Sequence, residues 1–148
     1  MNGWRAGAVS VLAALGVCLA FAAGAAELQE GRDFRLVSPP LTAPKDTIEV
    51  AEFFWYGCPH CFDFEPELAA WVKKLPAGVS FRRVPALFPA VQGRLQQARE
   101  LGPAAGLTGV PAVMVQGRYL ALTRGDYEEL LAVIEGLVER ARMETGIR

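Results

Sequence analysis

Hydrophobic positions change their spacing several times along the chain, and these changes predict alternating strands and helices. The segment from Ile48 to Tyr56 is β-branched and aromatic except for its acids, which is typical of a buried central strand. From Pro59 to Lys74, apolar residues recur at helical spacing, and proline is tolerated in the first turn of a helix. The other predicted elements are an edge strand at 34–37, a strand at 79–84, a helix at about 91–101, hairpin strands at 112–115 and 119–122, and a last helix. This order is typical of an α/β domain in which helices flank a mixed sheet.

The last predicted helix has its own start signal. Asp126 and Glu129 have the spacing of a capping box, in which side chains satisfy free N–H groups of the first turn. An apolar stripe at helical spacing then predicts the buried face, formed by Tyr127, Leu130, Leu131, Ile134, Leu137, Val138 and Ala141.

The first 26 residues differ from the rest of the chain. Arg5 is their only charged residue, and the 21 residues after it are rich in alanine, leucine and valine and end in small residues. This pattern is typical of a cleaved secretory signal. We expect cleavage after Ala25 or Ala26, which leaves 27–148 as one exported, periplasmic domain. The alternative is an uncleaved anchor, because a stretch of this length can span a bilayer.

Composition and charge narrow the possible functions. The chain has 148 residues, with 15 Lys and Arg against 16 Asp and Glu and a formal net charge of −1. No basic patch or block of like charge indicates a nucleic-acid partner or a membrane-surface partner. Beyond the first 26 residues, the apolar content is ordinary for a globular domain, which excludes disorder, coiled coil and collagen.

The predicted exported domain keeps two cysteines, Cys58 and Cys61, with Pro59 and His60 between them. Such a pair can form a disulfide in an oxidising compartment, and so short a loop adds little stability, which favours a chemical role. Cys58 falls at the start of a predicted helix, where free N–H groups and the helix dipole favour a thiolate. His60, the only histidine of the chain, can stabilise the same thiolate and so make the disulfide oxidising.

The cysteine pair has two other possible interpretations. One is half of a zinc site, although the sequence has no second cysteine pair and no further histidine. The other is a purely structural disulfide. We expect neither a metal nor another cofactor.

Several segments together resemble a known family. They are EFFWYG directly before the cysteines, the CPHC motif itself, FDFEPEL after it, and GVPA before the hairpin. These segments resemble the DsbA proteins, periplasmic thiol oxidants of the thioredoxin superfamily, over residues 31 to about 142. The resemblance implies a thioredoxin-like fold and an enzyme that introduces disulfides into client proteins. It also implies unfolded or reduced exported proteins as partners, and re-oxidation by a DsbB-like membrane quinone reductase.

The resemblance assigns roles to residues of this chain. Cys58 matches the exposed nucleophilic cysteine, and Cys61 matches the buried resolving cysteine. Pro59 and His60 match the dipeptide that adjusts the redox properties of the cysteine pair. A further match, Pro111, is the cis-proline that faces the disulfide. Without the family, a trans proline opening a strand would be favoured, because cis is the rarer state.

Two more matches concern the binding of the client and the proton of the resolving thiol. Val110 matches the residue whose backbone pairs with an extended client. Glu52 resembles the buried acid that accepts the proton of the inner thiol, and burial would raise its pKa. The alternative is that Glu52 faces solvent or pairs structurally with Arg82 or Arg83. Glu65 also matches a family acid, but we expect a solvated helix residue there.

The chain departs from the family after its predicted strand at 79–84. DsbA proteins carry several inserted helices at this point, whereas here Phe88 leads directly into a segment resembling the helix that follows the insertion. We therefore expect the helical insertion to be largely or wholly absent. Because the insertion normally walls an apolar groove beside the active site, exposed Phe62, Leu87 and Phe88 could form a patch that binds unfolded chains.

Two alternative functions stay open. One is a periplasmic reductase or isomerase with a specific client, and the other is a non-catalytic, client-binding shortened paralogue. The histidine between the cysteines favours oxidation.

Overall fold

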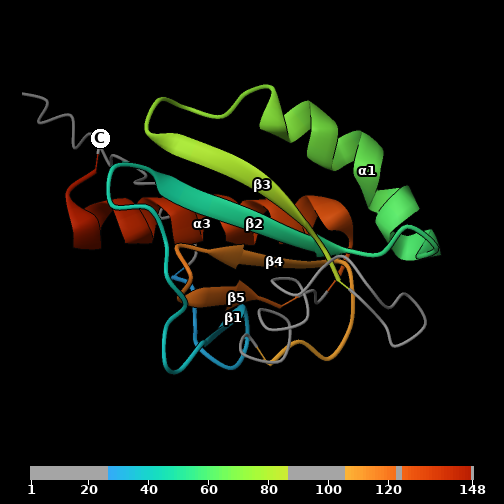
Figure 1. Cartoon of the computed structure of the whole chain (residues 1–148), viewed down its shortest axis with the longest axis horizontal. Helices are drawn as coiled ribbons and strands as arrows, with labels where there is room; N and C mark the ends of the chain where they lie inside the picture. The colour runs from blue at the N-terminus through green and yellow to red at the C-terminus, as the bar shows by residue number, and fades with distance from the viewer. Residues whose placement is uncertain (1–26, 87–105, 123–124, 148) are drawn as a thin grey trace, which may run out of the picture.

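The computed structural model describes residues 27–86, 106–122 and 125–147 (Figure 1). Its elements in chain order are β1 (Phe34–Leu36), β2 (Ile48–Phe54), α1 (Pro59–Val72), β3 (Val79–Pro85), β4 (Ala112–Val115), β5 (Tyr119–Ala121) and α3 (Tyr127–Thr145). The predicted order is confirmed for these elements. The predicted signal at 1–26, the predicted helix at 91–101, Leu87 and Phe88 lie outside the described residues.

The described strands form one mixed sheet in the order β1-β5-β4-β2-β3. Strand β2 pairs parallel with β3 and antiparallel with β4, so it lies inside the sheet as predicted. The hairpin of β4 and β5 is antiparallel, and β1 closes one edge beside β5. Because only residues 86–111 join β3 to β4, the fold is a thioredoxin-like sheet with a much shortened helical insertion.

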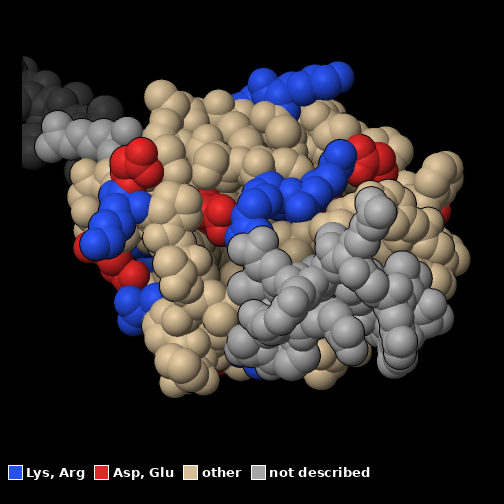
Figure 2. Space-filling view, in the orientation of Figure 1, with Lys and Arg blue, Asp and Glu red and all other residues tan. Residues whose placement is uncertain are grey.

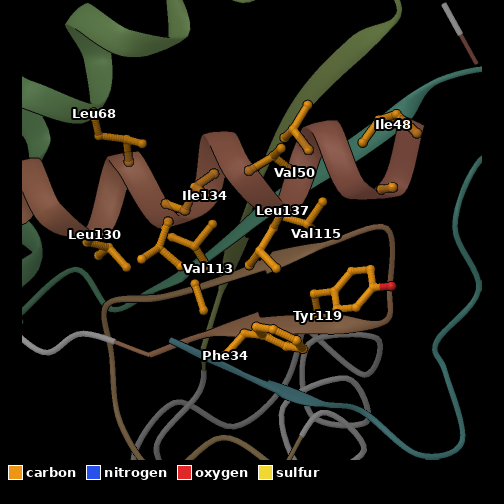
Figure 3. Close-up of a cluster of buried hydrophobic side chains, with 14 of the residues drawn as sticks. Phe34, Ile48, Val50, Leu68, Val113, Val115, Tyr119, Leu130, Ile134 and Leu137 are labelled. Atoms are coloured by element: carbon orange, nitrogen blue, oxygen red, sulfur yellow. The ribbon is translucent and has the colours of Figure 1, made fainter. Parts of the chain in front are cut away.

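Helices α1 and α3 pack on one face of this sheet (Figure 1). Figure 3 shows Leu68 of α1 and Ile134 and Leu137 of α3 directed toward Val50 and Val113 of the sheet. All five side chains are fully buried. Each such burial contributes about 1.5–3 kcal/mol, so this layer fixes both helices on the strands.

The opposite face of the sheet has a second, smaller apolar cluster, formed by Val37, Ala51, Phe53, Val84, Met114 and Leu120. Alternation along β2 assigns its even-numbered residues to the helix face and its odd-numbered residues to this one. On the face seen in Figure 2, the acidic side chains lie next to basic ones, and one further group of basic side chains lies apart at the upper edge. No helix among the described residues is long and apolar enough to cross a membrane.

Asp126 caps α3 as predicted, because its side chain accepts the backbone N–H of Glu129 at 2.9 Å. We expect Asp126→Ala to lower the free energy of unfolding by about 1 kcal/mol, since it leaves that first-turn N–H without its partner. Urea unfolding would measure the loss. Asp46→Ala, in an exposed loop, is the control, and equal midpoints for the two variants would contradict a capping role.

Candidate active site

The turn from β2 into α1 places the cysteines at the end of a buried strand. The backbone N–H of Cys58 donates to the carbonyl of Trp55 at 3.0 Å, which closes this turn. Cys58 is the N-cap of α1, with extended backbone angles of φ −89° and ψ 112°. Pro59 follows in the first turn, where a helix needs no N–H from it. The chain therefore directs the Cys58 side chain at the free N–H groups of the helix.

The Cys58 sulfur contacts two elements. The backbone N–H of Cys61 donates to it at an N···S distance of 3.3 Å, and the sulfur lies 3.5 Å from the carbonyl oxygen of Val110. The Val110–Pro111 peptide bond is cis, as the family resemblance implied. Both cysteines are free thiols, so this geometry is that of the reduced pair.

The expectation that Cys58 is exposed is wrong for this structure. Its exposed fraction is 8%, against 7% for Cys61, so burial does not distinguish the two residues. The physical reason is the position of the sulfur between the end of its own helix and the Val110 carbonyl. Exposed apolar side chains do surround the motif, because Tyr56 is 84% and Phe62 80% exposed.

The surroundings of Cys61 favour its protonated thiol. The pKa of Cys61 is raised to about 12, first because burial disfavours its thiolate. Its hydrogen bond with Cys58 and the negative charges of Cys58 and Glu52 raise it further, while a backbone hydrogen bond involving Trp55 lowers it. The Cys61 thiol therefore keeps its proton unless a base removes it.

Glu52 is buried, as the resemblance implied, and it is paired with an arginine, as the alternative expected. It is 2% exposed, and the Nε of Arg83 donates to it at 3.1 Å. Burial raises the pKa of Glu52, an effect that Arg83 partly offsets. Parallel pairing sets Glu52 opposite Arg83, on the same face of the sheet. Arg82 lies on the other face and instead pairs with Glu49 at 2.8 Å.

Glu65 is a half-exposed residue of α1, which agrees with the expected solvated helix residue, and it also forms an ion pair with Arg83. A terminal nitrogen of Arg83 donates to both of its carboxylate oxygens, at 2.7 and 2.6 Å. Glu65 follows Cys61 by four residues, so the two share a face of α1. That spacing is a signal by which the sequence could have placed Glu65 beside the pair.

These groups border a hollow of about 440 Å³, lined by Glu52, Phe54, Trp55, Tyr56, Cys58, Cys61, Phe62, Glu65, Arg83 and Pro85. A second hollow of about 650 Å³ includes Val110 and Pro111 and extends to His60 and Tyr127. Both cysteines, Glu52 and Arg83 thus share one cavity, and the cis-proline loop borders another. In the part of the chain that the structure describes, no group of three or more potential ligands could hold a metal ion.

One contact of the CPHC motif was not predicted from the sequence. The hydroxyl of Tyr127, the first residue of α3, donates to the carbonyl oxygen of His60 at 2.8 Å. The tyrosine ring also packs on Phe64 of α1, with ring centroids 4.8 Å apart. In the sequence, Tyr127 is only one member of the apolar stripe, so nothing there signals a contact with the motif.

Comparison with known proteins gives the family relation. No family model matches the chain. The thiol:disulfide interchange protein DsbA of Burkholderia cepacia is 47% identical over 85 residues, which cover 53% of this chain and 40% of that protein. The DsbA of Azotobacter vinelandii is 55% identical over 64 residues, which cover 43% of this chain and 30% of its relative. These matches span less than half of the relatives' own length.

Solved structures agree with the sequence matches. The crystal structure of Pseudomonas aeruginosa DsbA superposes with a TM-score of 0.72 at 27% identity, covering 78% of this chain and 95% of that one. Reduced DsbA1 of Neisseria meningitidis, at 19% identity and a TM-score of 0.73, shares the fold. In sequence and in fold, the chain is therefore DsbA-like.

Proposed function

We propose that this chain is an exported thiol:disulfide oxidoreductase that introduces disulfides into reduced client proteins. The observation that carries the proposal is the position of the Cys58 sulfur. It accepts the Cys61 N–H at the start of α1 and lies opposite a cis-proline loop. A thiolate formed there is stabilised by the helix N-terminus, which makes Cys58 a good leaving group and its disulfide a good oxidant.

The reaction begins from the Cys58–Cys61 disulfide. A client thiolate attacks the Cys58 sulfur, the bond to Cys61 breaks, and Cys61 leaves with the electron pair and takes up a proton. The second client thiolate then attacks the client sulfur of the mixed disulfide and releases Cys58 as a thiolate. The client loses two electrons and the pair gains them. A DsbB-like membrane quinone reductase would re-oxidise the pair.

Glu52 is placed to exchange the proton of Cys61. Its carboxyl group lines the same hollow as the Cys61 sulfur, and its pKa is raised by burial, so it can carry a proton closer to neutral pH. During client oxidation it would protonate the departing Cys61. During re-oxidation it would accept the proton again, while Arg83 holds its position.

Clients would bind as an added strand at the cis-proline loop. Val110 precedes Pro111, and its carbonyl already faces the Cys58 sulfur. Main-chain pairing with an extended client gives affinity with little dependence on client sequence, which suits an oxidant of many proteins. Residues 1–26 would act as the signal that brings the chain to the periplasm, with cleavage after Ala25 or Ala26.

The redox equilibrium of the purified protein with glutathione tests this function, with the fluorescence of Trp55, in the turn before Cys58, as the signal. We expect a potential between about −120 and −180 mV, the known range from DsbA to disulfide isomerases. A potential near about −270 mV, that of thioredoxin, would favour a reductase. The absence of any redox-linked transition would favour a non-catalytic, client-binding protein.

A further inference from the structure

A single peptide group connects α3 with the reactive sulfur. The Tyr127 hydroxyl donates to the carbonyl oxygen of His60 at 2.8 Å. That carbonyl belongs to the His60–Cys61 peptide group, whose N–H donates to the Cys58 sulfur at 3.3 Å. The same amide therefore accepts one hydrogen bond at its oxygen and donates another from its nitrogen.

Hydrogen bonds at the two ends of an amide are not independent. Resonance couples the oxygen to the nitrogen, so a donor at the oxygen increases the polarity of the group and strengthens its N–H as a donor. The gain is largest when the acceptor is charged, because hydrogen bonds to ions are about twice as strong as neutral ones. A Cys58 thiolate would gain more than a Cys58 thiol or a disulfide sulfur.

We propose that Tyr127 is a positioning residue that stabilises the thiolate form of Cys58 through the His60–Cys61 peptide group. The inference rests on the proposed oxidoreductase function and adds a residue to it. By favouring the reduced thiolate, the Tyr127 hydroxyl makes the Cys58–Cys61 disulfide a stronger oxidant. The sulfur is thereby coupled to a helix far away in the sequence.

The fold holds the Tyr127 hydroxyl in place. Its ring packs on Phe64, a fully buried residue of α1, and its helix is capped by the residue before it, Asp126. Figure 1 shows that α1 and α3 begin at the same end of the sheet. Tyr127→Phe removes the hydroxyl and keeps the ring contact, so it tests the hydrogen bond rather than the packing.

The groups that face the bond are mostly acidic. Burial raises the pKa of Tyr127, and negative charges on neighbouring groups, first Asp63, raise it further. The hydroxyl therefore stays protonated, and remains a donor, across neutral pH. The titratable groups around Tyr127 and Cys58 are Arg35 of β1, Glu52 of β2, His60, Cys61, Asp63, Glu65 and Glu67 of α1, Arg83 of β3 and Asp126 of the α3 cap.

The experiment compares the glutathione equilibrium of the full-length wild-type protein with that of Tyr127→Phe. We expect the constant for oxidation of the variant by glutathione disulfide to rise about two- to threefold, because its reduced form is less stable. This is the size given by a change of about 10–30% in a charge-assisted hydrogen bond. Thiolate absorbance at 240 nm should fall at a pH where Cys58 is partly ionised. Both differences should vanish in acid, where the sulfur is protonated in both proteins.

Tyr119→Phe is the matched control, because the Tyr119 hydroxyl also donates a hydrogen bond, to Glu144 at 2.6 Å near the end of α3. We expect its equilibrium constant to equal that of the wild type. Equal shifts in both variants, a shift that persists in acid, or no shift in Tyr127→Phe would each overturn the inference. A wild type without a redox-linked transition would instead overturn the proposed function.

A second substitution keeps the test open if Tyr127→Phe does not fold. Incorporation of 3-fluorotyrosine at position 127 keeps the ring and the hydroxyl but makes the hydroxyl a stronger donor. We expect the equilibrium constant to move in the opposite direction, below the wild-type value. No movement, or movement in the same direction as the phenylalanine variant, would contradict tuning through the peptide group.

Discussion

Replacement of Cys58 with serine should abolish thiol transfer. A hydroxyl forms no disulfide and cannot replace the sulfur that a client thiolate attacks, while Cys61 keeps its proton because its pKa is raised to about 12. We expect the rate at which a reduced two-cysteine peptide is oxidised to fall to the uncatalysed rate. Alkylation of the remaining thiols at fixed times, followed by mass spectrometry, would measure this rate for the wild type and for Cys58→Ser.

Cys61→Ser is the comparison that assigns the two roles. It keeps the Cys58 sulfur at the start of α1 but lacks the resolving thiol. With a peptide that already contains a disulfide, the Cys58 thiolate attacks one peptide sulfur, the other leaves as a thiolate, and the mixed disulfide should accumulate. Transfer by Cys58→Ser, or trapping at Cys61 rather than Cys58, would reverse the assignment. If Cys58→Ser suppresses aggregation of a reduced client and the wild type transfers no thiols, the chain is a client-binding protein.

The sequence predicted those elements whose apolar pattern has one physical interpretation. The run that begins at Ile48 is apolar on both faces and could only be an inner strand, and the stripe of α3 begins at a capping residue, Asp126. The hairpin turn was predicted as well, but not the reason for its glycine. Gly117 has a φ of +63°, and a Cβ there would lie 2.2 Å from the Leu41 carbonyl oxygen.

Side-chain pairing was less accessible from the sequence. Both Arg82 and Arg83 were candidates for Glu52, and only the parallel register of β2 with β3 decides for Arg83. A shift of one residue would have sent the arginines to the opposite faces of the sheet. Register depends on contacts between distant segments, which the pattern of one strand does not contain.

The same limit applies around Cys58. Its place at a helix start follows from the local sequence, because Pro59 favours the first turn. The burial of Cys58 does not follow from the local sequence, because the carbonyl that covers its sulfur belongs to Val110, more than fifty residues away. The contact of Tyr127 with His60 is equally distant, since the residues are 67 positions apart in the chain.

Glu52→Gln should slow thiol transfer by roughly 10- to 100-fold, since general acid–base groups contribute about 10²–10⁴-fold and solvent can replace part of the role. In the wild type, release of a mixed disulfide by Cys61 should accelerate with pH as Glu52 loses its proton. The amide of glutamine does not titrate, so the rise of the release rate with pH should disappear in the variant. Rapid-quench measurement of release from pH 4 to 8 would show it.

Stability gives an independent measurement of the same carboxyl group. Burial raises the pKa of Glu52 in the folded protein, so the folded state binds this proton more tightly than the unfolded state does. Protonation therefore stabilises the fold, and this contribution is complete only at a pH below the ordinary pKa range of a carboxyl group. As the pH rises through the raised value, folding loses that contribution. Glu52→Gln keeps a neutral group throughout, so its free energy of unfolding should exceed that of the wild type at neutral pH, with the excess shrinking in acid.

Glu49→Gln is the control that separates proton transfer from loss of an ion pair. Glu49 is also a nearly buried acid of β2 paired with an arginine of β3, but it lies on the opposite face of the sheet from Cys61. Its replacement should alter stability while leaving the pH profile of mixed-disulfide release unchanged. If both variants alter that profile alike, the effect belongs to the sheet, and Glu52 has no special part in the proton transfer.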